Sequence, residues 1–139
     1  MLFRIIYSSR ITRFLSRQEL QELCHRASER NRRDNITGLF LCDGVRFLQA
    51  IEGEREVVEA LMHRIGRDDR HTNISYAYRG FVTDREFPDW SMQEPFGPGD
   101  DPTIFVQKVG IDVQNVSNPH LQAQFIGFAR LAASSKSRI

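Results

Sequence analysis

Two apolar stretches, residues 36–42 and 45–52, are separated by the dipeptide Asp43-Gly44. Each stretch has the length and the bulky side chains of a strand. Asp-Gly between apolar runs is a strong signal for a tight β-hairpin, because such a turn needs backbone angles that glycine adopts at low cost. The chain is therefore expected to contain an antiparallel pair of strands here, and the other elements must be arranged around it.

Three further strands are predicted on either side of this hairpin. Residues 2–7 form an apolar run, and this strand is expected to end at Ser8 and Ser9. Residues 75–82 are rich in side chains that favour strands, and residues 90–93 suffice for a short fifth strand. These segments give the hairpin neighbours with which it can form one sheet.

Two helices are predicted between the strands. Ser16 and Glu19 have the spacing of a capping box, which satisfies free N–H groups at a helix start, and the polar run 28–35 ends this helix. Gly53 is expected to break the third strand, and apolar residues at helical spacing place the second helix at about 54–66. The resulting order, β-α-β-β-α-β and a short strand, predicts an α+β fold of the ferredoxin-like type with two helices on one sheet face.

The composition changes at Pro95, where a segment rich in proline and glycine begins. We therefore divide the chain into a domain of residues 1–94 and a linker with a C-terminal helical extension, residues 95–139. Residues 103–109 suit a helix or a strand, and Asn118-Pro119 has the pattern of a helix start. This last helix is expected to cover the open sheet face or a partner protein, with residues 134–139 frayed.

Composition excludes several classes of protein. The 139 residues suit one domain with a short appendage, and the net charge of +1 gives no overall field that favours nucleic acid or a membrane. Cys24 and Cys42 lie in apolar stretches without a partner at metal spacing. We interpret them as reduced core residues of a cytoplasmic protein that binds no metal.

Two polar side chains stand in or beside predicted strands. Tyr7 either packs in the core or offers its O–H group to a hydrogen bond. Gln49 either faces solvent, as the alternation of a strand allows, or is buried with an amide that needs partners. A third feature is the basic cluster Arg26, Arg30, Arg32 and Arg33, which is either a solvated helix end or a contact for phosphate.

These residues belong to a longer pattern. It comprises Tyr7, Asn31, Ile36-Thr37-Gly38-Leu39-Phe40-Leu41, Phe47-Leu48-Gln49-Ala50-Ile51-Glu52-Gly53, Asp68-Asp69-Arg70-His71 and Phe87-Pro88-Asp89-Trp90-Ser91-Met92. In order and spacing the pattern resembles the BLUF family, the flavin-based sensors of blue light. The resemblance covers roughly residues 2–93 and leaves the C-terminal third unassigned.

The resemblance implies a flavin, usually FAD with FMN as the alternative, held between the two helices against the sheet. Tyr7 and Gln49 are then the photoactive pair, in which Gln49 bridges the tyrosine and the flavin. Asn31, which also suits a helix C-cap, is expected to bind the polar edge of the ring, with Ile36 and Ile65 as apolar walls.

The resemblance also assigns the outer part of the site. Asp68, Arg70 and His71 are expected near the ribityl chain and phosphates, with Arg64 as a further contact. Arg30 stands where relatives often carry a smaller polar residue or histidine, and its long side chain can reach a phosphate or the pocket rim. Trp90 and Met92 lie on the strand that signals, and one of them faces the flavin.

The function expected from this resemblance is light sensing without net chemistry. Excitation draws an electron and a proton from Tyr7, the pair recombines, and Gln49 is left in a new orientation or tautomer. We expect no enzymatic activity, an unidentified downstream protein as partner, and a homo-oligomer. The alternatives are a flavin-dependent oxidoreductase, and a ferredoxin-like binding module for RNA, although the paired aromatics of such RNA-binding sheets are missing.

Overall fold

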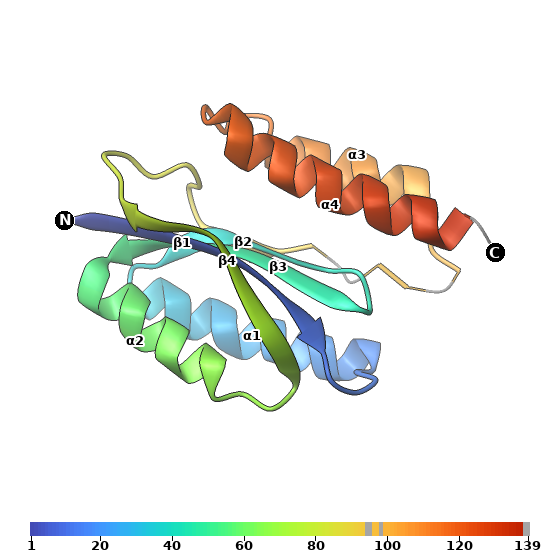
Figure 1. Cartoon of the computed structure of the whole chain (residues 1–139), viewed down its shortest axis with the longest axis horizontal. Helices are drawn as coiled ribbons and strands as arrows, with labels where there is room; N and C mark the ends of the chain where they lie inside the picture. Colours follow the sequence, from blue (N-terminus) through green and yellow to red (C-terminus); the bar gives the residue numbers. More distant parts are fainter. Residues whose placement is uncertain (94–95, 98, 138–139) are drawn as a thin grey trace.

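A computed structural model describes residues 1–93, 96–97 and 99–137 of the chain. Its elements follow the order expected from the sequence, with two helices added after the fifth strand (Figure 1). They are β1 (Leu2–Ile11), α1 (Arg17–Arg33), β2 (Thr37–Cys42), β3 (Arg46–Glu54), α2 (Arg55–Gly66), β4 (His71–Phe81), β5 (Trp90–Met92), α3 (Pro102–Asp112) and α4 (Pro119–Ser137).

The five strands form one sheet in the order β4-β1-β3-β2-β5. The pairs β4–β1, β1–β3 and β3–β2 are antiparallel, which is the ferredoxin-like arrangement that the sequence predicted. β5 lies parallel to β2 at the edge, where Gly38 is level with Trp90 and Phe40 with Met92. The short fifth strand therefore protects one edge of the sheet, and β4 forms the other.

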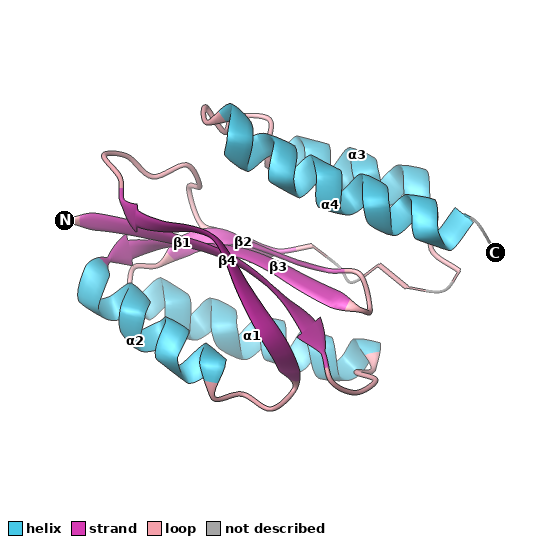
Figure 2. Cartoon of the chain, in the orientation of Figure 1, coloured by secondary structure: helices cyan, strands magenta, loops and turns pink. Residues whose placement is uncertain are grey.

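The molecule has three layers, with α1 and α2 on one face of the sheet and α3 and α4 on the other (Figures 1 and 2). β2 is buried along its whole length, so side chains on both faces of the sheet are covered there. Phe40 and Cys42 contact the core under α1 and α2, whereas Leu39 and Leu41 belong to the core under α3 and α4. A strand covered on both faces reads as a continuous apolar run rather than as an alternating one.

The predicted hairpin joins β2 and β3. The backbone N–H of Asp43 donates to Arg46 O (3.2 Å), which leaves Gly44 and Val45 at the tip, and Gly44 has the positive φ of 87° that this turn needs. Gly38 in β2 is required for a different reason. A Cβ atom built there would lie 1.8 Å from Ala50 O on β3, so only glycine permits this approach of the two strands.

Three predicted boundaries were wrong. β1 does not end at Ser8 and Ser9 but continues to Ile11, because both serines keep their backbone pairing with β3. Gly53 does not break β3, since it pairs with Phe3 of β1 inside the ladder. β4 begins at His71 rather than at residue 75, with a register shift near Ser8 that accommodates the extra residues.

The C-terminal segment is helical. Residues 103–109, which suited a helix or a strand, lie in α3, and Asp101 Oδ1 accepts from Thr103 N (2.9 Å) at its start. Pro119 is the first residue of α4, as predicted, and Asn118 Oδ1 accepts from His120 N (2.9 Å). α4 continues through residues 134–137, so the expected fraying there was wrong, whereas 138–139 and the linker residues 94, 95 and 98 lie outside the described residues.

One carboxylate connects several parts of the sheet. Glu52 on β3 is fully buried and accepts from Arg4 Nη2 (2.7 Å) on β1 and from Thr37 Oγ1 (3.0 Å) on β2. It also accepts from the backbone N–H groups of Glu86 (2.9 Å) and Phe87 (3.2 Å) in the segment before β5. Because a buried charge is tolerated only when it is paired and hydrogen-bonded, this group fixes the approach to β5.

Candidate functional site

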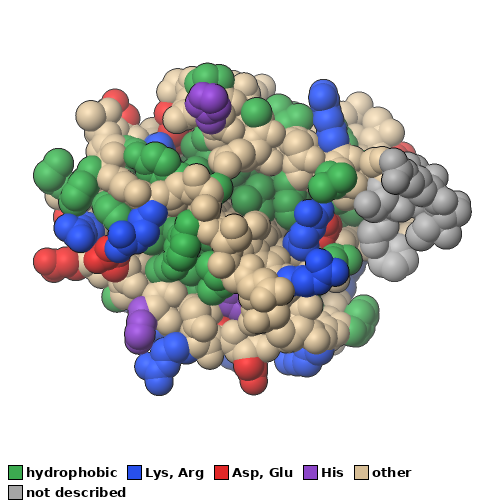
Figure 3. All heavy atoms as spheres, in the orientation of Figure 1, with side chains coloured by type: hydrophobic (Ala, Val, Ile, Leu, Met, Phe, Trp, Pro, Cys, Tyr) green, Lys and Arg blue, Asp and Glu red, His purple; other side chains and the backbone are tan. Residues whose placement is uncertain are grey.

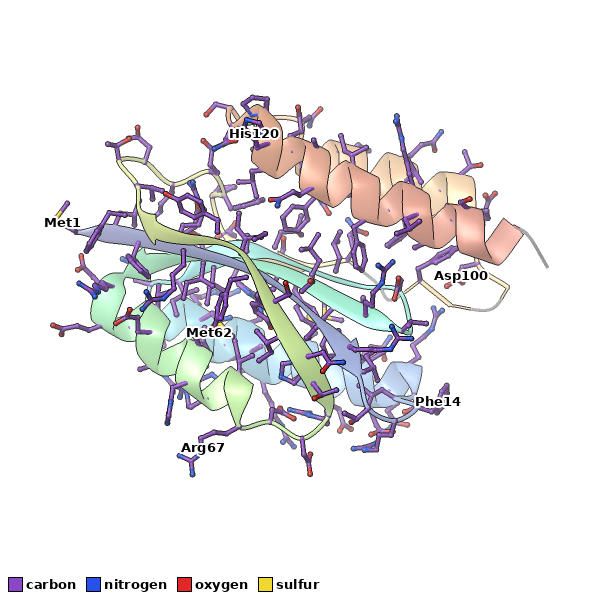
Figure 4. The ribbon with its side chains drawn as sticks, in the orientation of Figure 1. Met1, Phe14, Met62, Arg67, Asp100 and His120 are labelled. Carbon is purple, nitrogen blue, oxygen red and sulfur yellow. The ribbon has the colours of Figure 1, made fainter. Side chains whose placement is uncertain are left out.

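A cleft of about 170 Å³, partly open to solvent, lies between the helical layer of α1 and α2 and the sheet. Figure 4 shows the helical layer that borders the cleft, with Met62 of α2 pointing toward the sheet and Arg67 pointing away from it. The lining residues are Tyr7, Leu23, Cys24, Ala27, Arg30, Asn31, Phe40, Phe47, Gln49, Leu61, Arg64, Ile65, Asp68, Arg70, His71, Trp90 and Met92.

Tyr7, Gln49 and Trp90 form a hydrogen-bonded chain on the floor of this cleft. Tyr7 and Gln49 are cross-strand partners on β1 and β3, which places both side chains on the same sheet face. Gln49 Nε2 donates to Tyr7 Oη (2.6 Å), and Trp90 Nε1 on β5 donates to Gln49 Oε1 (3.0 Å). An indole N–H can only donate, so Trp90 determines which end of the amide faces β5.

The environment of Tyr7 keeps its phenol neutral. The side chain is almost completely buried. Loss of solvation raises the pKa of the Tyr7 phenol well above its ordinary value, although the hydrogen bond from Gln49 acts in the opposite direction. Tyr7 therefore carries its proton throughout the physiological pH range and holds it beside the amide of Gln49.

The end of α1 supplies two buried polar atoms that need partners. Asn31 is buried, and Ile36 N donates to its backbone carbonyl (2.8 Å), which returns the chain toward β2. Among the described residues, Asn31 Oδ1 and Arg30 Nε are buried side-chain atoms without a hydrogen-bond partner. Both residues line the cleft, and buried polar atoms of this kind need a hydrogen-bond partner, which a molecule in the cleft would supply.

Asp68 and Arg70 form a pair at the end of α2. Arg70 Nε donates to Asp68 Oδ1 (2.9 Å), and Arg70 Nη2 makes a further short contact with Asp68 Oδ2. These bonds lower the pKa of the Asp68 carboxyl and raise that of the Arg70 guanidinium. Much of the Arg70 fork, which the sequence assigned to phosphate, is thus occupied by a carboxylate of the same loop.

His71 lies at the start of β4, where both ring nitrogens have partners. Its Nε2 is 2.7 Å from Ile65 O, and a carbonyl oxygen only accepts, so Nε2 carries a proton. Its Nδ1 is 2.7 Å from Ser9 Oγ on β1. The histidine therefore ties the end of α2 to the sheet beside the cleft. Among the described residues, no group of His, Cys, Asp or Glu side chains has the arrangement of a metal site.

Of the site residues that the resemblance assigned, the structure brings all but Ile36 to the cleft, and of the basic cluster only Arg30 lines it, whereas Arg26, Arg32 and Arg33 do not. Ile36 precedes β2 and packs near Gly53 and Val58 instead. Six apolar lining residues were not named as site residues, and these are Leu23, Cys24, Ala27, Phe40, Phe47 and Leu61. Three of them, Leu23, Cys24 and Ala27, recur at helical spacing on one face of α1, and only the position of α1 beside α2 over the sheet shows that this face lines a cavity rather than a closed core.

Comparison with known proteins agrees with this arrangement. Residues 2–93 match the BLUF family, described as sensors of blue-light using FAD. The chain belongs to the BLUF family. The match covers β1 through β5 with α1 and α2, and so includes every residue that lines the cleft.

Two curated relatives show the same domain in longer proteins. The chain is 33% identical over 92 residues to the photoactivated adenylate cyclase subunit beta of Euglena gracilis, covering 66% of this chain and 11% of that protein. It is 31% identical over 93 residues to the blue light- and temperature-regulated antirepressor BluF of Escherichia coli, covering 67% and 23%. This BLUF chain thus spans between 7% and 23% of the length of the curated relatives that it matches.

Solved structures match most of the chain. The BLUF domain of BlrP1 superposes with a TM-score of 0.74 at 27% identity, covering 97% of this chain and 92% of that one. BlrB, a BLUF protein in its dark state, gives a TM-score of 0.66 at 30% identity and covers 96% of both chains. These matches extend beyond residue 93 and so include part of the helical pair α3 and α4.

The cleft suits the flavin that the family uses. Leu23, Ala27 and Ile65 offer apolar walls from the two helices, and Phe40 and Phe47, whose rings are tilted by 47° to each other, offer aromatic contacts from the sheet. A flavin ring carries N–H and C=O groups along one edge, which are the partners that the unpaired atoms of Asn31 and Arg30 lack. The residues present therefore fit a planar heteroaromatic ligand with a polar edge.

Proposed function

We propose that this BLUF chain senses blue light through Tyr7 and Gln49, with FAD as the flavin in the cleft between α1 and α2. The observation that carries the proposal is the hydrogen-bonded chain from Tyr7 through Gln49 to Trp90, which begins beside the cleft and ends on an edge strand. Asn31, Arg30, Arg64, Ile65, Asp68, Arg70 and His71 are proposed to hold the flavin.

A bound oxidised flavin absorbs blue light and, once excited, accepts an electron from a nearby donor. Tyr7 is the donor in this proposal. Its phenol is neutral and buried, so it gives up its proton together with the electron, and it regains both when the system relaxes. Because Gln49 Nε2 donates to Tyr7 Oη, the loss and return of the phenol's own proton are proposed to change the strength of this hydrogen bond once in each cycle.

Gln49 converts this event into a lasting change. In the arrangement described, Gln49 Oε1 accepts from Trp90, and Gln49 Nε2 donates to Tyr7. Turning the amide would place its NH₂ group against the indole N–H, and two donors cannot bond to each other. A tautomer with a protonated oxygen keeps a lone pair that can still accept from the indole, so it weakens this hydrogen bond without removing it. Turning the amide is therefore the change that releases Trp90 and biases β5 toward a second position.

β5 is connected on both sides to the helical pair α3 and α4. After the strand, Gln93 Nε2 donates to Asp112 Oδ2 at the end of α3. Before the strand, Glu86 accepts from Ser117 Oγ (2.6 Å) in the turn between α3 and α4. Because Glu52 also fixes the backbone N–H of Glu86, a displacement of β5 is proposed to act on α3 through Gln93 and Asp112, where an output protein would detect it.

Several finer points are also proposals. The unit 1–94 is proposed as the sensor, and 95–139 as the extension that makes the output contact with an unidentified protein. Tyr76, Tyr78 and Phe81 of β4 are exposed, and apolar side chains gather over this strand in Figure 3, which supports a homo-oligomer. We also propose a cytoplasmic protein without nucleic-acid partners. No described helix is long and apolar enough to cross a membrane.

The test is the visible spectrum of the purified protein before and after a blue flash. We expect a flavin band that shifts slightly to the red and returns in the dark. Tyr7→Phe should retain the flavin and lose this shift, whereas Tyr76→Phe, which removes an exposed hydroxyl on β4, should keep it. An intact red shift in Tyr7→Phe would show that Tyr7 is not the donor.

A further inference from the structure

The connection between β4 and β5 crosses the whole sheet (Figure 1). The two strands lie at opposite edges of the order β4-β1-β3-β2-β5, so residues 82–89 must pass β1, β3 and β2. Neighbouring strands lie about 4.8 Å apart, which makes this passage about 19 Å wide. The connecting residues belong to no helix or strand. Their course, and with it the position of Trp90 at the start of β5, therefore depends on contacts with the strands that they pass.

Two of these strands hold the segment through one buried ion pair. On β1, Arg4 Nη2 donates to the backbone oxygen of Asp84 (3.1 Å). On β3, Glu52 accepts from the backbone N–H groups of residues 86–87 at 2.9 Å and 3.2 Å. Arg4 also donates to Glu52 Oε2 from Nε (2.9 Å) and from Nη2 (2.7 Å). The contacts from β1 and β3 are thus joined to each other, and both end on the same stretch of chain.

Little chain remains between this ion pair and Trp90. Residues 88–89 separate Trp90 from the last N–H group that Glu52 holds, and two extended residues span about 7 Å at most. β5 itself pairs with β2 over three residues only. The place of the indole, whose Nε1 donates to Gln49 Oε1 (3.0 Å), therefore depends on the contacts ahead of the strand as well as on the strand pairing.

Among the described residues, every hydrogen-bond partner of the Glu52 carboxylate is a donor. Arg4 and the two backbone N–H groups donate to it. Thr37 Oγ1 also donates to it (3.0 Å), and the same hydroxyl accepts from Arg85 Nη1 (2.9 Å). A glutamine has the same size, but its NH₂ group is a donor and would lie against these donors. The position therefore requires a carboxylate rather than a polar side chain of the same volume.

We propose that Glu52 is a positioning residue for light sensing, which holds the segment before β5 so that Trp90 reaches the amide of Gln49. Glu52 does not line the cleft, so it acts on the amide through the residues that it positions. The inference rests on the proposed role of Gln49 and adds a residue that sets its hydrogen bonding from outside the site. Without this carboxylate, the indole donates to Gln49 less often, and the amide orientation that the indole favours is less stable.

The first test uses the full chain without flavin. Trp90 is the only tryptophan, and its side chain is buried, so intrinsic fluorescence reports its surroundings directly. We expect Glu52→Gln to shift the emission maximum to longer wavelength and to increase quenching by acrylamide. Glu54→Gln makes the same substitution at an exposed carboxylate of β3, and it should change neither quantity.

A second variant covers the case in which Glu52→Gln does not fold. Arg4→Met combined with Glu52→Leu replaces the buried ion pair by apolar side chains of similar size, an exchange that folded proteins often tolerate. It removes the same contacts to residues 84–87, so it should produce the same shift in Trp90 emission.

The next experiment asks whether Glu52 acts through Trp90, and it uses the flavin-bound chain. Glu52→Gln should slow the dark return of the red shift by about twofold to tenfold, the equivalent of one hydrogen bond. In a Trp90→Phe background the same substitution should leave the return rate unchanged, because the indole that it would displace is absent. A purely structural role would lower stability in both backgrounds without this dependence on Trp90.

Unchanged Trp90 emission in folded Glu52→Gln, or in the double variant, would overturn the proposal. An equal change of the return rate with and without the indole would also overturn it, because Glu52 would then act by another route. A chain without any light-induced red shift would instead refute the proposed function, and the emission of the flavin-free variants would still show whether Glu52 positions Trp90.

Discussion

Single hydrogen atoms decide the orientation of the amide at the centre of this site. Trp90 Nε1 only donates, so Gln49 Oε1 must face it, and the NH₂ group is left for Tyr7. The phenol oxygen can donate as well as accept, so it is compatible with either orientation of the amide. The indole is therefore the group that makes one orientation more stable in the arrangement described.

This reasoning predicts the result of replacing Trp90 by Phe. The buried carbonyl of Gln49 loses its donor, and the free energy of unfolding should fall by about 1–3 kcal/mol. Part of this loss comes from the smaller ring, so Gln49→Leu provides the comparison. In that background Trp90→Phe should cost less, because no carbonyl is left unpaired. Urea unfolding of the four proteins measures the difference, and equal costs in both backgrounds would contradict the argument.

Asp68 gives a residue-scale prediction for acid conditions. Its hydrogen bonds from Arg70 lower the folded-state pKa below the ordinary value of 3.8. Its contribution to stability is therefore complete above that ordinary value and is lost as the pH falls through the lowered folded-state pKa. Because the pair is partly exposed, we expect a contribution of about 0.5–1 kcal/mol.

Urea unfolding between pH 7 and pH 3 checks this expectation. Asp68→Asn should be less stable than the unmodified chain at pH 7, and the difference should shrink at the acid end. Asp69→Asn removes the neighbouring carboxylate and leaves the Asp68–Arg70 pair in place, so it should retain the acid dependence. A constant difference between the two proteins at all pH values would rule out an electrostatic origin.

At the scale of elements, the approach of β2 to β3 sets the shape of the cleft floor. Phe40 and Gln49 are cross-strand partners in this pair, as are Cys42 and Phe47. The pair can close only because Gly38 has no side chain, since a Cβ atom there would overlap Ala50 O. The position of Gln49 beneath the cleft thus depends on a glycine that does not itself line it.

Gly38→Ala should therefore be severely destabilising, by about 4 kcal/mol or more, since the backbone of β3 must move. Gly110→Ala is the matched control in α3. A Cβ atom there meets nothing within 4 Å, and alanine in a helix should stabilise by about 0.4–1 kcal/mol. Thermal unfolding of the two variants compares them directly. A Gly38→Ala protein as stable as the unmodified chain would mean that the strands separate without cost.

The order of elements was predictable because each has a local signal, such as Asp43-Gly44 at the hairpin and Ser16 with Glu19 at the start of α1. Strand ends were harder, because Ser8 and Gly53 are weak strand residues that the neighbouring strands nevertheless pair. The cleft residues followed from a resemblance rather than from periodicity. Periodicity alone cannot tell the lining of a cavity from a closed core, so Leu23 was missed, and the resemblance placed Ile36 at the flavin although it does not line the cleft.

For the molecule as a whole, the sheet face opposite the cleft depends on the C-terminal helices. Ile6, Leu39, Leu41, Leu48 and Ala50 of the sheet pack with α3 and α4 in one apolar core. Among the described parts of α3 and α4, no residue lines the cleft, so ligand binding and the covering of this face are spatially separate. The flavin site and the C-terminal helices therefore occupy opposite faces of one sheet.

A chain ending at Gln93 should therefore bind flavin but associate with itself. The truncation leaves the cleft residues in place and exposes the apolar sheet face that α3 and α4 cover. We expect dimers or larger species in sedimentation velocity, together with a retained flavin spectrum. Replacing Leu39 and Leu41 by Ser in the truncated chain should reduce this association. A monomeric truncated chain would show that the exposed sheet face does not mediate self-association.

Glu52 sets a mechanical condition on any movement of β5. The carboxylate accepts from the backbone N–H groups of Glu86 and Phe87. Releasing them would leave the buried Glu52 carboxylate with Arg4 as its charged partner and fewer hydrogen bonds. The segment before β5 is therefore anchored three residues ahead of Trp90. A strand that is fixed at one end cannot slide along its neighbour, so any movement of β5 is a rotation about residues 86–87. Its largest displacement is then at Met92 and Gln93, at the entrance to the chain segment that leads to α3.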